Sequence, residues 1–190
     1  MYLNRNILSS LLGILILLTL SALIYSAYTL QQDRQINQQI HQLSQGGSLI
    51  DPEQLDMNAA EVRIAYAALQ KDLNLFDEAV ETYSATERLA NEQQFVQIHY
   101  NLGNLYLTQA IDLAENLSVD RAVAMADVAK DFYRSALKQQ PDFWEAKYNL
   151  EAAQRLSRDL PLGDVIISEE STENSTELWS AMPGFPIGLP

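Results

Sequence analysis

Few side chains in this sequence could act as nucleophiles or metal ligands. The chain has no cysteine, and its two histidines, His41 and His99, lie in no recognisable catalytic or zinc-binding motif. Nucleophilic chemistry needs an activated Ser, Cys or Lys beside a base, and the sequence also has no phosphate-binding loop or dinucleotide fingerprint. Paired carboxylates such as Asp77 and Glu78 are usually a solvated face in so acidic a chain. We therefore predict that the protein is not an enzyme and holds no cofactor or metal ion.

A different chemistry, hydrogen bonding to another polypeptide, suits several polar side chains. Asn101 and Asn104 are spaced to lie on neighbouring faces of a helix, where their amides can donate to and accept from a peptide backbone. The other candidate partner-binding residues on the first helices of the two expected helical pairs are Arg63, Tyr66, Gln70 and His99. For any single one of these residues, a simple solvated surface is the alternative interpretation.

The acidic balance of the chain argues against a nucleic-acid partner. The sequence has 25 acidic and 12 basic residues, which give a formal net charge of −13. Binding to phosphates relies on clustered Lys and Arg, which this composition does not supply. The excess of carboxylates instead favours solubility or a basic partner.

Residues 7–30 form a long apolar stretch of 24 residues without a charge. About 20 apolar residues span the hydrocarbon core of a bilayer as a helix, so we predict that residues 1–30 are a short amino terminus and a transmembrane anchor. Arg5 lies before the stretch, and a basic flank normally stays in the cytoplasm. The expected location is a bacterial inner membrane, crossed once, with the amino terminus in the cytoplasm and the remainder in the periplasm. The alternatives are a cleaved secretory signal, which has a shorter apolar core, and a buried core helix.

Residues 31–57 are expected to form a polar helical stalk and a linker. The segment is rich in glutamine, and Ile36, Ile40 and Leu43 recur at the spacing of one helix face. The Gly-Gly pair at 46–47 then breaks the helical pattern. We therefore expect the anchor helix to continue as the stalk and to end before this pair.

Residues 58–160 are predicted to form an all-α domain of antiparallel helical hairpins. Apolar residues recur at helical spacing throughout, and Gly103 and Pro141 are the only glycine and proline in this range. With so few helix breakers, the stretch favours long helices over strands. Residues 141–158 would form the closing helix of the domain, because terminal repeats must cover the exposed apolar face of a stack.

Two segments of this domain resemble tetratricopeptide repeats, in which small residues let paired helices approach and larger ones fill the gaps. The better match has the repeat's characteristic residues at Leu102, Gly103, Tyr106, Ala129, Tyr133, Ala136 and Pro141. The weaker, upstream match has them at Tyr66, Ala67, Ala79 and Tyr83. The resemblance implies stacked helical pairs whose first helices line a concave binding surface.

The better match is about 14 residues longer than the usual repeat between Gly103 and Ala129. This excess equals four helical turns at about 3.6 residues each. We expect the extra residues to lengthen both helices by two turns, because residues 110–126 keep a helix-like composition. The connecting turn is then expected near residues 116–120.

Residues 161–190 are predicted to form an acidic linker and a non-helical C-terminal motif. After Arg158 the chain has no Lys or Arg, and three prolines and two glycines follow Trp179, a composition that excludes helix. Met182, Phe185 and Trp179 itself are apolar side chains that a solvated tail would not need, so they join the candidate partner-binding residues. Docking onto the same domain, docking into a partner protein and no docking are all open.

Three features of the sequence coincide. They are the N-terminal anchor, a truncated repeat that ends ALKQQPDFWEAKYNLEAAQRL, and the terminal WSAMPGFPIGLP. Together they resemble the MxaK family of small membrane-anchored proteins, which are encoded with MoxR-type AAA+ ATPases and von Willebrand factor A domain proteins in methanol-oxidation gene clusters. The resemblance implies an accessory role in assembling or activating a periplasmic enzyme, which for that family is methanol dehydrogenase and its calcium. The implied partners are von Willebrand factor A domain membrane proteins and, indirectly, a MoxR-type ATPase.

The resemblance supplies no calcium site in this chain. The acidic tail lacks an Asp-x-Asp-x-Asp-Gly loop, so a solvated linker is the simpler interpretation of its carboxylates. A general envelope scaffold that binds peptides or proteins is the alternative function of the same class. A metal-delivery protein or a small hydrolase is the alternative from another class.

Overall fold

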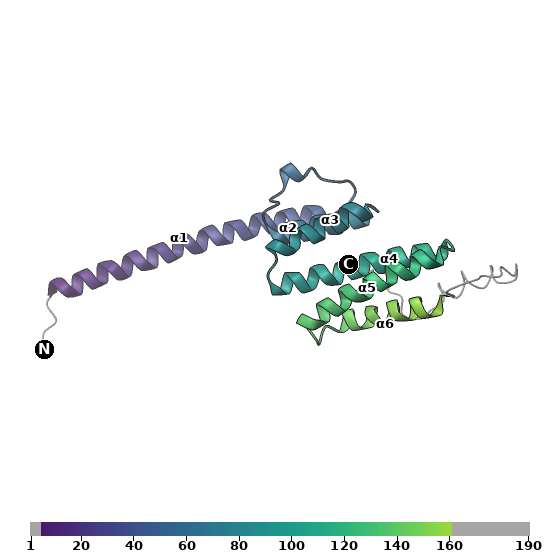
Figure 1. Cartoon of the computed structure of the whole chain (residues 1–190). Coiled ribbons are helices and arrows are strands. Elements are labelled where there is room, and N and C mark those ends of the chain that lie inside the picture. Colours follow the sequence, from purple (N-terminus) through teal and green to yellow (C-terminus); the bar gives the residue numbers. More distant parts are fainter. Residues whose placement is uncertain (1–4, 161–190) are drawn as a thin grey trace, which may run out of the picture. The chain divides into compact units, whose positions relative to one another are not determined.

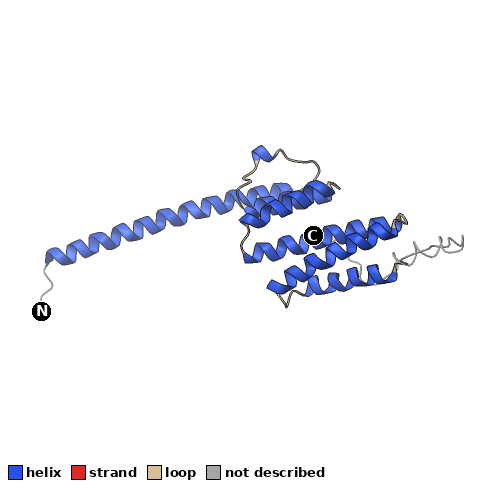
Figure 2. Cartoon of the chain, viewed as in Figure 1, coloured by secondary structure: helices blue, strands red, loops and turns tan. Residues whose placement is uncertain are grey.

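A computed structural model gives the backbone of residues 5–160 and the side chains of residues 10–160. Within these residues the chain is all-helical and forms no strand (Figure 2). The chain divides after Leu75 into two compact units. The first unit contains α1 (Arg5–Ser44), the short 3-10 helix η1 (Pro52–Gln54) and α2 (Ala60–Asp72). The second unit contains α3 (Phe76–Thr86), η2 (Glu87–Leu89), α4 (Glu92–Glu115), α5 (Val119–Gln139) and α6 (Trp144–Asp159).

Helix α1 is unbroken over 40 residues (Figure 1). It is the one helix in the described part of the chain that is long and apolar enough to cross a membrane. Its large apolar side chains from Leu11 to Leu30 are 51–70% exposed, whereas a core helix of a soluble domain would bury them. The interpretation as a buried core helix is therefore wrong.

The last turns of α1 pack against α2 in the core of the first unit. Leu43 on α1 is only 2% exposed, and it lies in one cluster with Val62, Tyr66 and Leu69 of α2. The backbone N–H of Asp56 donates to Gln39 Oε1 of α1 at 3.0 Å, which fixes the intervening loop to the same helix. The expected stalk is thus the end of α1 itself, so the apolar span and the folded core of this unit share one rigid helix.

A glycine pair allows the chain to leave α1. Gly46 and Gly47 have φ angles of 65° and 101°, values that residues with a Cβ seldom adopt. The helix ends at Ser44, just before this pair, as the sequence predicts.

Helices α4 and α5 form a long hairpin in the second unit. Asn91 and Gln94 form a capping box that starts α4, and the hairpin turn between Glu115 and Val119 contains Leu117 with a φ of 57°. The turn falls where the sequence predicts it, and the extra residues lengthen both helices. That prediction is confirmed.

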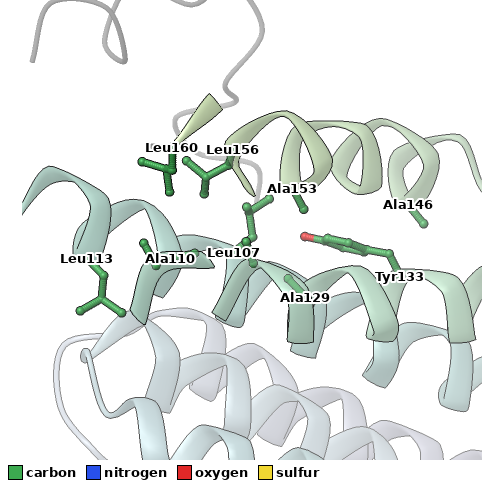
Figure 3. Close-up of a cluster of buried hydrophobic side chains, with 11 residues drawn as sticks. Leu107, Ala110, Leu113, Ala129, Tyr133, Ala146, Ala153, Leu156 and Leu160 are labelled. Atoms are coloured by element: carbon green, nitrogen blue, oxygen red, sulfur yellow. The ribbon is translucent and has the colours of Figure 1, made fainter. Parts of the chain in front are cut away.

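The core of the second unit is built from small side chains. Ala122, Ala126 and Ala129 on α5 are fully buried against α4, and α6 covers the other side of α5 with Ala146 and Ala153 (Figure 3). Figure 1 shows α4, α5 and α6 side by side. Small residues thus let these helices approach, as the sequence predicts, while the stacking geometry of a tetratricopeptide repeat stays a prediction.

Candidate protein-interaction surface

One side of α4 carries a row of polar side chains, which we call the α4 polar face. Its members recur every three or four residues, the spacing that puts side chains on one side of a helix. They are Gln93, Gln97, Asn101, Asn104 and Thr108; the two asparagines are half-buried and the other three are exposed. Four of these five residues carry amides, each of which offers two N–H donors and one carbonyl acceptor. The predicted binding residues Asn101 and Asn104 therefore lie together on one face.

Asn104 is held in one orientation by two neighbouring helices. Its Oδ1 accepts a hydrogen bond from the Tyr133 hydroxyl of α5 at 2.8 Å and another from Asn149 Nδ2 of α6 at 2.8 Å. Asn149 Nδ2 also lies 3.3 Å from the hydroxyl oxygen of Tyr100 on α4, to which it donates. Both of these hydrogen bonds use the carbonyl oxygen of the Asn104 amide, so they leave its two N–H donors unused. The four residues define an amide–phenol cluster that joins α4, α5 and α6.

The Tyr133 hydroxyl acts as a permanent donor in this cluster. Its side chain is fully buried, and Figure 3 shows its ring between α5 and the alanines Ala146 and Ala153 of α6. Burial raises the pKa of the Tyr133 phenol far above its ordinary value, since the charged form would lose its hydration. The phenol therefore stays protonated and keeps the Asn104 amide oriented over the whole physiological pH range.

Asn149 is a member of the cluster that our sequence interpretation missed. A signal for it is present, because Tyr148-Asn149-Leu150 repeats the triplet Tyr100-Asn101-Leu102 on the earlier helix. The recurrence places the same triplet on α4 and α6. It did not indicate which asparagine would face inward.

Removing the Tyr133 hydroxyl tests the cluster. We expect Tyr133→Phe to lower the free energy of unfolding of the second unit by about 1 kcal/mol, because one buried hydrogen bond is lost while Asn149 still satisfies Asn104. Thermal unfolding of the detergent-solubilised full chain, followed by helical circular dichroism, measures the change. Tyr100→Phe is the control: among the described residues its hydroxyl accepts a single, longer bond of 3.3 Å, so the loss should be smaller. Equal losses for the two variants would contradict the assigned geometry.

His99 lies inside the second unit, on the side of α4 away from the α4 polar face. It is 8% exposed, its ring stacks on Phe95 with centroids 3.9 Å apart, and Phe132 of α5 meets it edge-on at 5.4 Å. Glu87 Oε1 lies 3.3 Å from His99 Nε2, yet the two groups are not aligned for a hydrogen bond in the described structure. The ring is therefore part of an aromatic cluster and presents little surface to a partner.

The burial of His99 predicts a pH effect on stability. Burial lowers the pKa of His99 below its ordinary value of 6.5, and nearby Glu87 opposes this shift. Below pH 6.5 the unfolded chain gains a proton that the folded chain does not, so His99 should make the fold less stable as the pH falls from 6.5, by at most about 1.4 kcal/mol per pH unit. Above pH 6.5 the effect should vanish. Unfolding at pH 7.5 and 5.5 should show a smaller acid loss for His99→Gln than for the parent chain; an equal or larger loss would contradict the assignment.

The remaining predicted residues on helices belong to the first unit. Arg63, Tyr66 and Gln70 recur along one side of α2. The Arg63 Nε donates to the backbone carbonyl of Met57, and Tyr66 is 4% exposed in the core. Gln70 is 6% exposed, and its Oε1 has no hydrogen-bond partner among the described residues. These three side chains are thus mainly internal.

The rest of the predicted set cannot be compared with the structure. Trp179, Met182 and Phe185 lie outside the described residues. In the described range, no group of three or more His, Asp or Glu side chains is placed to hold a metal ion. The α4 polar face is consequently the part of the predicted surface that combines exposure with hydrogen-bonding capacity.

Comparison with known proteins adds no further assignment. No protein-family model, curated protein or solved structure matches this chain.

Proposed function

We propose that this protein is a membrane-tethered helical accessory protein that binds a segment of a partner protein through the α4 polar face. The observation that carries this proposal is the fixed orientation of Asn104, whose carbonyl is bound inside the unit by Tyr133 and Asn149. An amide held in this way presents its donors without a further loss of side-chain entropy on binding. Gln97 and Asn101 lie beside it and can bind neighbouring peptide groups of an extended segment.

The tether supports the same proposal. Leu43 of α1 is buried in the core of the first unit, so that core begins only 13 residues beyond the end of the apolar stretch at residue 30. A helix of 13 residues is about 20 Å long. With α1 in a bilayer, the first unit would stay close to the membrane surface, which favours partners that are themselves membrane proteins.

The proposed partners come from the resemblance to the MxaK family. They are membrane proteins with a von Willebrand factor A domain, which act with a MoxR-type ATPase to assemble or activate a periplasmic enzyme. In the proposed orientation the helical units lie outside the cytoplasm, where a cytoplasmic ATPase does not reach them. Coupling between the two would then pass through the membrane-embedded partners.

Affinity recovery from detergent-solubilised membranes tests this function. The full chain should recover von Willebrand factor A domain proteins, and Gln97→Ala combined with Asn101→Ala should reduce the affinity about 30-fold, since two hydrogen bonds of about 1 kcal/mol each are lost. Gln139→Ala combined with Gln140→Ala, which changes two exposed glutamines at the end of α5, is the matched control and should have no effect. Failure to recover such a protein in several detergents would contradict the proposal.

A further inference from the structure

The last helix of the described chain has an exposed outer face. Its inner side packs Ala146, Ala153 and Leu156 into the core of the second unit. The opposite side, which we call the outer face of α6, consists of Trp144, Lys147, Glu151, Gln154, Arg155 and Arg158. Trp144 is 71% exposed, so its ring is accessible to another apolar segment.

The outer face of α6 carries three cations and one carboxylate, so it is net positive within an acidic protein. Arg155 lies eight residues after Lys147 and three before Arg158, while Glu151 pairs with Arg155, and Asp159 pairs with Arg158 at 3.2 Å. Exposed pairs of this kind contribute only about 0–1 kcal/mol. Other carboxylates can therefore compete for these guanidinium groups.

The chain itself supplies such carboxylates directly after this helix. Residues 161–190 contain no Lys or Arg, and their five acidic residues are Asp164, Glu169, Glu170, Glu173 and Glu177. The same segment carries Trp179, Met182 and Phe185 beyond the last carboxylate. Two of the three cations on the outer face lie near the end of α6, and Trp144 lies at its start. A segment that runs back along α6 from its end would therefore meet the cations with its acidic residues first and Trp144 with its apolar residues afterwards.

The chain length permits this arrangement. Leu160, where the described chain leaves α6, is buried, and its N–H bonds to the Leu156 carbonyl at 3.2 Å, so the exit point is fixed at the end of α6. The 16 residues of α6 span about 24 Å, which an extended chain covers in about seven residues. The 30 residues that follow are more than enough to return to Trp144.

We infer that residues 161–190 dock onto the outer face of α6 of the same chain. The acidic stretch lies along Lys147, Arg155 and Arg158, and the apolar side chains that follow it cover Trp144. A tethered segment of this length has an effective concentration of about 1 mM, so even weak docking is well populated. A second copy is a poorer occupant, because two chains of net charge −13 repel each other.

Thiol labelling tests this docking, since the chain has no cysteine of its own. Gln154→Cys places one thiol in the middle of the outer face, and its reaction with a maleimide is measured in the detergent-solubilised full chain and in a chain that ends at Leu160. We expect labelling to be about tenfold slower in the full chain. This factor is the ratio of an effective concentration of ~1 mM to a dissociation constant for docking of about 0.1 mM. Ala124→Cys, exposed on α5, is the control and should react equally in both.

A charge variant gives an independent readout if the shortened chain folds poorly. In the full chain with Gln154→Cys, the double change Lys147→Glu and Arg158→Glu should speed labelling several-fold. Arg134→Glu with Lys138→Glu alters the net charge equally on exposed positions of α5 and should not. Equal labelling of the parent and the Lys147/Arg158 variant would overturn the inference and leave the face open to a partner protein. Protection that disappears on dilution would also overturn it, in favour of a second copy.

Discussion

Replacing Gly103 by alanine is expected to destabilise the second unit by about 2 kcal/mol. A Cβ built at Gly103 of α4 would lie 2.5 to 2.9 Å from three ring atoms of Tyr133 on α5. The ring cannot move aside easily, because it is fully buried and its hydroxyl is bound to Asn104. Overpacking of a core destabilises a protein by about 1–3 kcal/mol, and so tight a contact favours a loss near the upper end of this range. Alanine has a better helix propensity than glycine, which offsets about 1 kcal/mol of that loss.

Hydrogen exchange of α4 and α5 is the measurement for Gly103→Ala. A loss of about 2 kcal/mol should speed exchange of their most protected amides roughly 30-fold. Gly13→Ala is the matched control, since a Cβ at Gly13 of α1 would meet nothing within 4 Å, and exchange in the second unit should not change. If Gly103→Ala left protection unchanged or increased it, the close approach of α4 and α5 would be refuted.

Replacing Leu43 by alanine is expected to destabilise the first unit by about 2–5 kcal/mol, the usual range for truncating a buried leucine. Leu43 is 2% exposed and is the buried side chain with which α1 enters the cluster of Val62, Tyr66 and Leu69. Ile36 and the Gln39–Asp56 hydrogen bond would remain, but the buried anchor of this end of α1 would be lost, so the variant should loosen α1 from α2. The apolar stretch of residues 7–30, which ends before this position, should be unaffected.

Protease sensitivity of the loop between α1 and α2 reports this detachment. We expect Leu43→Ala to be cut in residues 45–59 at least tenfold faster than the parent chain in detergent, because opening of the unit becomes more frequent. Leu49→Ala, which truncates a leucine that is 47% exposed, should change the rate little. Unchanged cleavage of Leu43→Ala would show that α1 and α2 are held by other contacts.

The helices and their ends could be predicted from local rules. The long helices follow from the uncharged stretch at 7–30, the glycine pair at 46–47 and the near absence of helix breakers between residues 58 and 160. Small residues at Gly103 and Ala129 indicated close helix packing, and the structure places Tyr133 against Gly103. These features depend on neighbours within a few turns of the chain, so they can be recognised in the sequence.

Which polar residue faces inward could not be predicted in the same way. Asn101 and Asn104 are equivalent in spacing, yet only Asn104 meets Tyr133 and Asn149, which are 29 and 45 residues away in the sequence. The sequence also did not indicate that His99 would be enclosed by Phe95 and Phe132. These assignments depend on the rotation of each helix in the assembled unit.

The division of the chain is another property that local rules did not give. The sequence suggested one domain over residues 58–160, and these bounds stay a prediction; the structure packs as two compact units that divide after Leu75. Only a short turn between Asp72 and Phe76, with Asn74 at a φ of 60°, separates the helices there. No change in composition marks such a boundary.

The most direct test of the central claim is site-specific photo-crosslinking from the α4 polar face in intact membranes. A photoreactive residue at Gln97 or at Asn101 should form an adduct with a membrane protein that has a von Willebrand factor A domain. The same residue at Ala124, exposed on α5, should form none. No such adduct from the two α4 positions, or an equal yield from Ala124, would contradict the claim that this face binds the partner.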